Sequence, residues 1–212
     1  MCKITPFILV FSIVLQFNCK IEAQNLDINI LKPINQNSSE FLRSYSEIIS
    51  NTTTVVALAP PAVIGIMSLI EKDDEMFKIA LNMGAAIAVD GIIVQSIKRT
   101  VRRPRPYSTY PEDIIGYQTL SSLSFPSGHT SLAFTTATSM SLNYPKWYVI
   151  VPSFLWAGSV GYSRMNLGVH YPSDVLAGAL LGAGSAYLSY KVNKWYWKKK
   201  NNKKIIGLNN YF

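Results

Sequence analysis

The chain has 212 residues, of which 49% are hydrophobic and 15% charged, and its formal net charge is +8. This length is enough for one domain with a sizeable core, and the basic charge is typical of a phosphate substrate, a membrane surface or a nucleic acid. Nucleic acid is the weakest of the three, because the cations form dense clusters between long apolar runs rather than a stripe with interleaved aromatic residues.

Residues 1–23 have the composition of a signal peptide or N-terminal anchor. Lys3 precedes a long apolar run, and Ala23 supplies a small residue before a cleavage point. The two cysteines of the chain, Cys2 and Cys19, both lie in this segment, and the residues before Cys19 fit a lipidation site poorly. A mature chain without thiols cannot build a zinc site of cysteine and histidine, so we expect no metal or other cofactor.

Residues 24–50 form a polar N-terminal segment, in which we expect a short amphipathic helix around Phe41 and Ile49. Residues 51–192 have the composition of a helical core, and residues 193–212 are a lysine-rich tail. Turn-forming residues divide the core into five apolar runs, which are residues 52–70, 79–97, 130–144, 147–162 and 175–190.

The length and the Ala/Leu content of these runs predict an all-α fold, a helical bundle of about five core helices. Runs of this length can span a membrane. Trp195 and Trp197 stand at the head of the lysine-rich tail, as expected for the cytoplasmic end of a last span, and favour a membrane bundle over a soluble one. Gly178 and Gly182 give the last helix a small-residue face for close packing.

Both histidines and five of the six arginines fall in three short clusters. The first puts five cations into eight residues at the end of an apolar run: Lys98, Arg99, Arg102, Arg103 and Arg105. Such crowding is unfavourable unless an anion or carboxylates neutralise it. The alternative interpretation is a charge cluster at a membrane boundary.

The second cluster is Ser127, Gly128 and His129, which follow a proline at the start of an apolar run. A helix that begins here presents unpaired backbone N–H groups, which bind anions. An ordinary helix cap beside a packed histidine is an equally good interpretation of these residues alone.

The third cluster contains Arg164, His170 and Asp174. The spacing of four lets Asp174 accept a hydrogen bond from one ring nitrogen of His170 and leaves the other nitrogen as a nucleophile or base. A capping aspartate and a buried structural histidine are the alternatives for each residue alone, and the presence of Arg164 disfavours them.

Together these motifs resemble, in order and at every fixed position, the three-part signature of the type 2 phosphatidic acid phosphatase superfamily. That superfamily also holds bacterial acid phosphatases and vanadium haloperoxidases. The matching motifs are Lys98-x6-Arg105-Pro106, Pro126-Ser127-Gly128-His129 and Ser163-Arg164-x5-His170-x3-Asp174.

The resemblance implies a role for each matched residue. His170 would attack phosphorus and form a phosphohistidine, with Asp174 fixing its tautomer, and His129 would protonate the leaving group and then activate water. The phosphate oxygens would be held, without a metal, by Lys98, Arg105, Ser127, Gly128 and Arg164.

Other charged residues match no fixed position. We expect Arg99, Arg102 and Arg103 to add to the local positive field rather than to act as ligands. Asp90, in the second run, is a functional candidate because it is an ionisable residue at membrane depth. We expect the milder role for it, neutralising the arginine cluster.

The sequence thus predicts an integral membrane phosphatase whose partners are a phosphorylated lipid and the membrane. Phosphatidic acid, an isoprenyl pyrophosphate, phosphatidylglycerol phosphate and phosphorylated lipid A all remain open as substrates, as does the oligomeric state. The alternatives are a secreted acid phosphatase of the same superfamily, a haloperoxidase, and a membrane protein that only binds phospholipid. With the N-terminus exported, five spans place all three clusters on the periplasmic or exterior face and the lysine tail in the cytoplasm.

Overall fold

The protein folds as a bundle of helices. The structure, a computed structural model, describes residues 20–120 and 123–209, and these ranges contain helices and no strand. The helices are α2 (Lys20–Gln36), α3 (Glu40–Glu71), α4 (Asp74–Val101), α5 (Pro106–Thr109), α6 (Gly128–Asn143), α7 (Trp147–Asn166) and α8 (Pro172–Asn209). The predicted all-α bundle with five core helices is confirmed.

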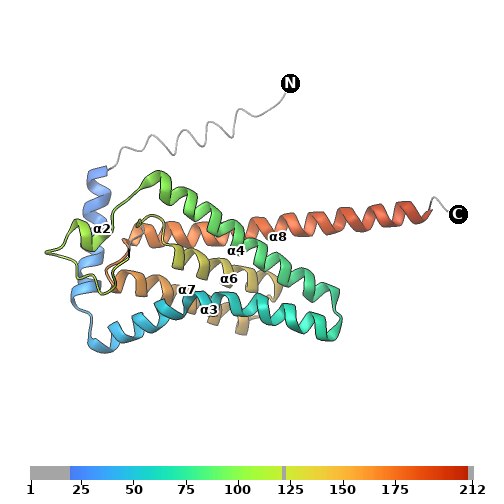
Figure 1. Ribbon diagram of the computed structural model, residues 1–212, viewed down its shortest axis with the longest axis horizontal. Coiled ribbons are helices and arrows are strands. Elements are labelled where there is room, and N and C mark those ends of the chain that lie inside the picture. The colour runs from blue at the N-terminus through green and yellow to red at the C-terminus, as the bar shows by residue number, and fades with distance from the viewer. Residues whose placement is uncertain (1–19, 121–122, 210–212) are drawn as a thin grey trace, which may run out of the picture.

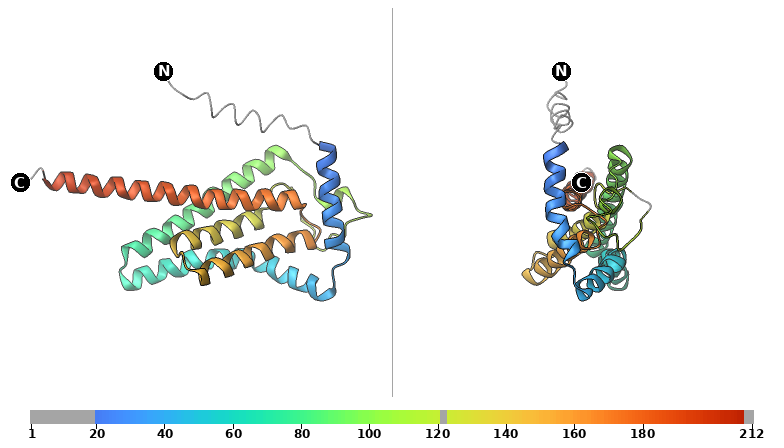
Figure 2. Two further views of the ribbon diagram at one scale, coloured as in Figure 1. Left: turned by 180° about the vertical axis from the view of Figure 1, so that it is seen from behind. Right: turned by 90° about the vertical axis from the view of Figure 1, so that its left-hand side faces the viewer.

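The five long helices run side by side, and α2 lies across one end of them (Figure 1). Figure 2 shows the same arrangement from behind, with α8 extending beyond the bundle at the opposite end. Helix α6 is central, since it packs against α3, α4, α7 and α8. The two ends of the bundle therefore differ, because α2 covers one of them and α8 projects from the other.

Close approach of α8 to α6 depends on the predicted small-residue face. A Cβ atom added at Gly182 would lie 2.1 Å from the carbonyl oxygen of Ser131, and one at Gly178 would lie 2.6 Å from that of Ser127. Only a residue without a side chain fits at either position.

The distribution of polarity is the reverse of that in a soluble protein. Small polar side chains such as Ser50, Thr135 and Ser163 are buried between the helices. Large apolar side chains face outward on the four long helices around α6, among them Val63, Ile92, Leu155 and Leu180. An apolar surface of this extent is suited to lipid rather than to water, which disfavours the secreted alternative. Two helical stretches, Glu40–Glu71 and Asp74–Thr109, are long and apolar enough to cross a membrane.

The N-terminal part of the chain is more helical than predicted. The helix expected around Phe41 is the beginning of α3, which starts after the capping residue Ser39 and continues through Pro60 and Pro61. Helix α2 was not expected. The predicted signal peptide or anchor, residues 1–23, lies mostly outside the described residues, as do both cysteines.

The role predicted for Asp90 is wrong. Its carboxylate is buried and accepts hydrogen bonds from Ser131 Oγ at 2.6 Å and from Ser185 Oγ at 3.4 Å. Asp90 therefore ties α4 to α6 and α8 within the bundle, and among the described residues no ion pair joins it to the arginine cluster.

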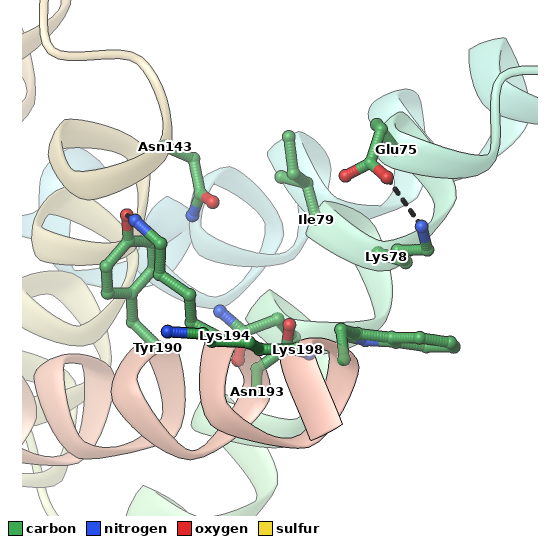
Figure 3. Close-up of a pocket in the computed structure, with 10 residues that line it drawn as sticks. Glu75, Lys78, Ile79, Asn143, Tyr190, Asn193, Lys194 and Lys198 are labelled. Atoms are coloured by element: carbon green, nitrogen blue, oxygen red, sulfur yellow. Dashed lines mark hydrogen bonds and ion pairs between the residues drawn. The ribbon is translucent and has the colours of Figure 1, made fainter. Parts of the chain in front are cut away.

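A cavity of about 560 Å³ lies at the end of the bundle away from α2, between α4, α6 and α8. Figure 3 shows Lys78, Asn143 and Lys194 at its walls, with Lys78 paired to Glu75 at 2.5 Å. None of the three predicted clusters reaches this cavity. The site that they form is at the other end.

The contact between α6 and α8 gives a stability prediction. We expect Gly182→Ala to lower the free energy of unfolding by about 2 kcal/mol, because its Cβ must displace backbone atoms, and the midpoint of thermal unfolding in detergent by roughly 5 °C. Gly184→Ala is the matched control, since a Cβ there meets nothing within 4 Å. Equal melting temperatures of the two variants would contradict this description of the contact.

Candidate active site

All three clusters lie at the end of the bundle covered by α2. Lys98 is in the last turn of α4 and Arg164 in the last turn of α7, whereas Ser127 directly precedes α6 and Asp174 is in the first turn of α8. Because α4 and α7 run opposite to α6 and α8, helix ends that are far apart in the sequence meet here.

A tight turn between α7 and α8 positions His170. Gly168 has a φ of 71°, and a Cβ there would lie 2.3 Å from the carbonyl oxygen of Ile115, so that glycine is required. After this turn the amides of Val169 and His170 both donate to the carbonyl of Arg164, each at 3.2 Å. The turn places the imidazole of His170 in the interior, where it is 2% exposed.

Asp174 is fully buried and accepts hydrogen bonds from several groups. Its Oδ2 lies 3.4 Å from His170 Nδ1 and accepts from the Tyr171 amide at 2.9 Å and from the Ser124 hydroxyl. Its Oδ1 accepts from Arg103 Nη1 at 2.8 Å. These donors compensate the cost of burying the carboxylate and hold it beside the imidazole.

The other ring nitrogen of His170, Nε2, lies 3.3 Å from Arg105 Nη1, which also donates to the Val169 carbonyl at 2.7 Å. With Nδ1 facing Asp174, the lone pair belongs on Nε2. Burial lowers the pKa of the His170 imidazole to about 3 despite the hydrogen bond and charge of Asp174, which raise it. The ring is therefore neutral at physiological pH and can act as a nucleophile.

Lys98 and Ser127 fix the chain in front of α6. Lys98 Nζ donates to the carbonyls of Leu123 and Ser124 at 2.5 and 3.3 Å. The Ser127 amide donates to the Asp174 carbonyl at 3.0 Å, and its hydroxyl pairs with Thr130 Oγ1 at 2.8 Å rather than capping the helix. The first N–H groups of α6, beginning at Gly128, thus receive no cap from the Ser127 side chain.

A polar cavity of about 340 Å³ opens beside His129 and Arg164. Its other lining residues are Ser50, Asn51, Gln118, Thr119 and Leu120. Arg164 is 1% exposed, and its Nη1 donates to Ser50 Oγ and, at 3.2 Å, to Gln118 Oε1. Its Nε is buried and, within the described part of the chain, has no hydrogen-bond partner. An anion in this cavity would supply an acceptor for that group.

The structure therefore brings most predicted site residues into one network. Arg105 contacts His170, the Ser127 amide contacts the Asp174 backbone, and His129 lies within electrostatic range of Lys98, Arg105 and Arg164. Among the described residues, no group of three or more His, Cys, Asp or Glu side chains is placed to hold a metal ion.

Sequence reasoning missed several residues of the network. Arg103, predicted to add only to the field, is an ion-pair partner of Asp174, which corrects that prediction. Ser124, three residues before the second cluster, and Asp27 on α2 were not singled out. Nothing in the spacing of the sequence relates residue 27 to residue 103, whereas Ser124 is close enough to the second cluster for its hydroxyl to have been considered.

Comparisons with known proteins agree with this geometry. The family model of the PAP2 superfamily matches residues 79–198. The chain is 29% identical over 171 residues to an undecaprenyl-diphosphatase of Sulfolobus acidocaldarius, covering 80% of each protein. Among solved structures it resembles Aquifex aeolicus LpxE, at 31% identity and a TM-score of 0.67, covering 78% of this chain and 95% of the other. It also resembles the transmembrane PAP2-type phosphatidylglycerolphosphate phosphatase of Bacillus subtilis, at 25% identity and a TM-score of 0.70, covering 89% and 92%.

The three motifs, the helical bundle and a family match over more than half of the chain all lead to the same assignment. The chain belongs to the PAP2 superfamily.

Proposed function

We propose that this protein is an integral membrane phosphatase that hydrolyses a lipid phosphate monoester or diphosphate through a phosphohistidine at His170. The observation that carries the proposal is the environment of His170. Its Nδ1 faces Asp174, its Nε2 faces Arg105, and the polar cavity with His129 and Arg164 lies in the same network. The apolar outer surface of the bundle supports a lipid as the substrate.

In the first step, the Nε2 lone pair of His170 forms a bond to phosphorus as the bond from phosphorus to the leaving oxygen breaks. His129, whose protonated form is stabilised beside the neighbouring cations by the negative charge of the bound phosphate, gives its proton to that oxygen. The oxygen belongs to an alcohol in a monoester and to a phosphate in a diphosphate. The imidazole becomes cationic, and the buried carboxylate of Asp174 stabilises this charge through Nδ1.

Charge on the equatorial oxygens of phosphorus is stabilised by the surrounding donors. Arg105 already lies against Nε2, where the phosphoryl group arrives. Further donors are the Nε of Arg164, which has no partner among the described residues, and the amides that begin at Gly128 and receive no cap from Ser127. Lys98 adds a buried positive charge.

In the second step, His129 removes a proton from water, which attacks phosphorus on the opposite side of the N–P bond. That bond breaks, its electron pair returns to Nε2 of His170, and inorganic phosphate leaves. His129 ends the cycle protonated, as it began.

The orientation of the protein follows from charge. Lys191, Lys194, Lys198 and Lys199 lie on α8 at the end of the bundle that is opposite to the active site, where Lys194 and Lys198 line the cavity beside Lys78. Because cytoplasmic ends of spans carry the excess of lysine and arginine, we infer that the active site faces the periplasm or the exterior. The substrate would then come from the outer leaflet.

The function is tested with purified protein in detergent and chelator, assayed on lipid monophosphates, lipid diphosphates and a soluble aryl phosphate. We expect lipid substrates to be turned over faster, because binding of their tails positions the headgroup. His170→Ala should lower kcat by about 10⁴-fold or more, since the covalent step is lost. Arg102→Gln, which removes an exposed cation, should stay near wild type. Activity of His170→Ala within tenfold of wild type would refute the assignment.

The orientation is tested by labelling single cysteines on intact cells. In a background with Cys2 and Cys19 replaced by serine, Ser108→Cys should react with an impermeant thiol reagent and Asp74→Cys should not. Both positions are exposed, the first in α5 beside the active site and the second at the start of α4, directly after the turn that follows α3. Labelling of Asp74→Cys but not of Ser108→Cys would reverse the orientation and the leaflet of the substrate.

A further inference from the structure

Helix α2 lies outside residues 79–198, which the family model matches, yet it carries a buried charge next to the active site. Asp27, in the middle of this helix, is 6% exposed. A buried carboxylate is unfavourable unless charged or hydrogen-bonding partners compensate it. The partners of Asp27 all belong to the active-site end of the bundle.

Two of these contacts go to Ser173, in the first turn of α8. Asp27 Oδ1 accepts from the Ser173 amide at 2.9 Å, and Oδ2 accepts from the Ser173 hydroxyl at 2.6 Å. The first N–H groups of a helix lack partners within the helix. Asp27, from a distant part of the chain, therefore caps the start of α8. The amide that it caps, that of Ser173, directly precedes Asp174.

The third contact goes to Arg103. Asp27 Oδ2 accepts from Arg103 Nη2 at 2.7 Å, while Nη1 of the same guanidinium donates to Asp174 Oδ1 at 2.8 Å and to Ser173 Oγ at 2.7 Å. The guanidinium also stacks on the ring of Tyr171, with its carbon 3.7 Å from the ring centroid. Arg103 thus bridges two carboxylates, and its planar fork fixes their separation.

Helix α2 is held in place independently of Asp27. Asn35 donates to the carbonyls of Ile115 and Asn166 at 3.0 and 2.9 Å and accepts from the Ile115 amide at 2.8 Å. Lys32 pairs with Asp113 at 2.5 Å. These contacts hold α2 on the bundle without the help of Asp27, so they also help to fix the position of Asp27.

We propose that Asp27 is a positioning residue for phosphoryl transfer: it orients Arg103 and the first turn of α8, and these hold Asp174 against Nδ1 of His170. This inference rests on the proposed function. Asp27 does not line the cavity beside His129, so its loss should impair the chemical step more than substrate binding. A displaced Asp174 would leave the tautomer and the orientation of His170 less well defined.

The first test compares Asp27→Asn with Asp113→Asn as a matched control. Each substitution removes one carboxylate that pairs with a cation and ties α2 to the rest of the fold. Asp113 pairs with Lys32, whereas Asp27 pairs with Arg103, which in turn pairs with Asp174. We expect Asp27→Asn to lower kcat by roughly tenfold to hundredfold with KM within about twofold, whereas Asp113→Asn should retain both values within about twofold. Thermal unfolding verifies that both variants are folded.

A second test asks whether Asp27 acts through Arg103. Arg103→Met should lower kcat, and adding Asp27→Asn to it should cause a smaller further loss than Asp27→Asn causes in the wild type, because only the contacts of Asp27 with Ser173 are then left to break. If Asp27→Asn does not fold, Ser173→Ala keeps every charge and removes only the hydroxyl that both side chains contact. For Ser173→Ala we expect a fall in kcat smaller than the one predicted for Asp27→Asn, with KM unchanged.

The outcomes separate this inference from the proposed function. No lipid phosphatase activity in the wild type would refute the function itself. An active wild type with Asp27→Asn indistinguishable from Asp113→Asn, a change confined to KM, additive losses in the double variant, or unchanged kcat in Ser173→Ala would each overturn the positioning role alone.

Discussion

The buried carboxylate of Asp174 is the group on which the active site depends. It accepts hydrogen bonds from Arg103 in the loop after α4, from Ser124 in the segment before α6, and from the amide of Tyr171 in the preceding turn. Desolvation of a carboxylate without such donors would cost several kcal/mol. The same carboxylate faces His170, so the contacts that make its burial possible also place the proposed nucleophile.

Reversed polarity makes this network possible. Lipid can cover the apolar outer surfaces of the helices, while the interior between them is free to hold hydroxyls, carboxylates and cations. Small residues let α6 and α8 approach closely, as at Gly178 and Gly182. That approach brings the start of α6 to the first turn of α8, where the Ser127 amide meets the Asp174 backbone. The close packing of these helices and the proposed phosphate site are thus parts of one arrangement.

Much of this could be predicted from the sequence, for local reasons. The uncharged runs predicted the five core helices. The motif spacings predicted the contact between His170 and Asp174, which are one helical turn apart. The remainder depends on tertiary contacts that leave no periodic signal. Helix α2 is largely polar, so its helicity is not evident from an apolar stripe, and the pairing of Asp27 with Arg103 joins residues 76 positions apart. Asp90 was misjudged for the same reason, because its hydroxyl partners come from two other helices.

The central claim is that His170 carries the phosphoryl group during turnover, and trapping that intermediate tests it most directly. The protein is mixed with a lipid substrate labelled with radioactive phosphorus at the transferred phosphate and quenched in alkali within a single turnover. A phosphohistidine is stable to base and labile to acid, so we expect base-stable, acid-labile label on the peptide that contains His170, and no label in His170→Ala. Acid-stable label, label on the peptide that contains His129, or labelled His170→Ala would contradict the mechanism.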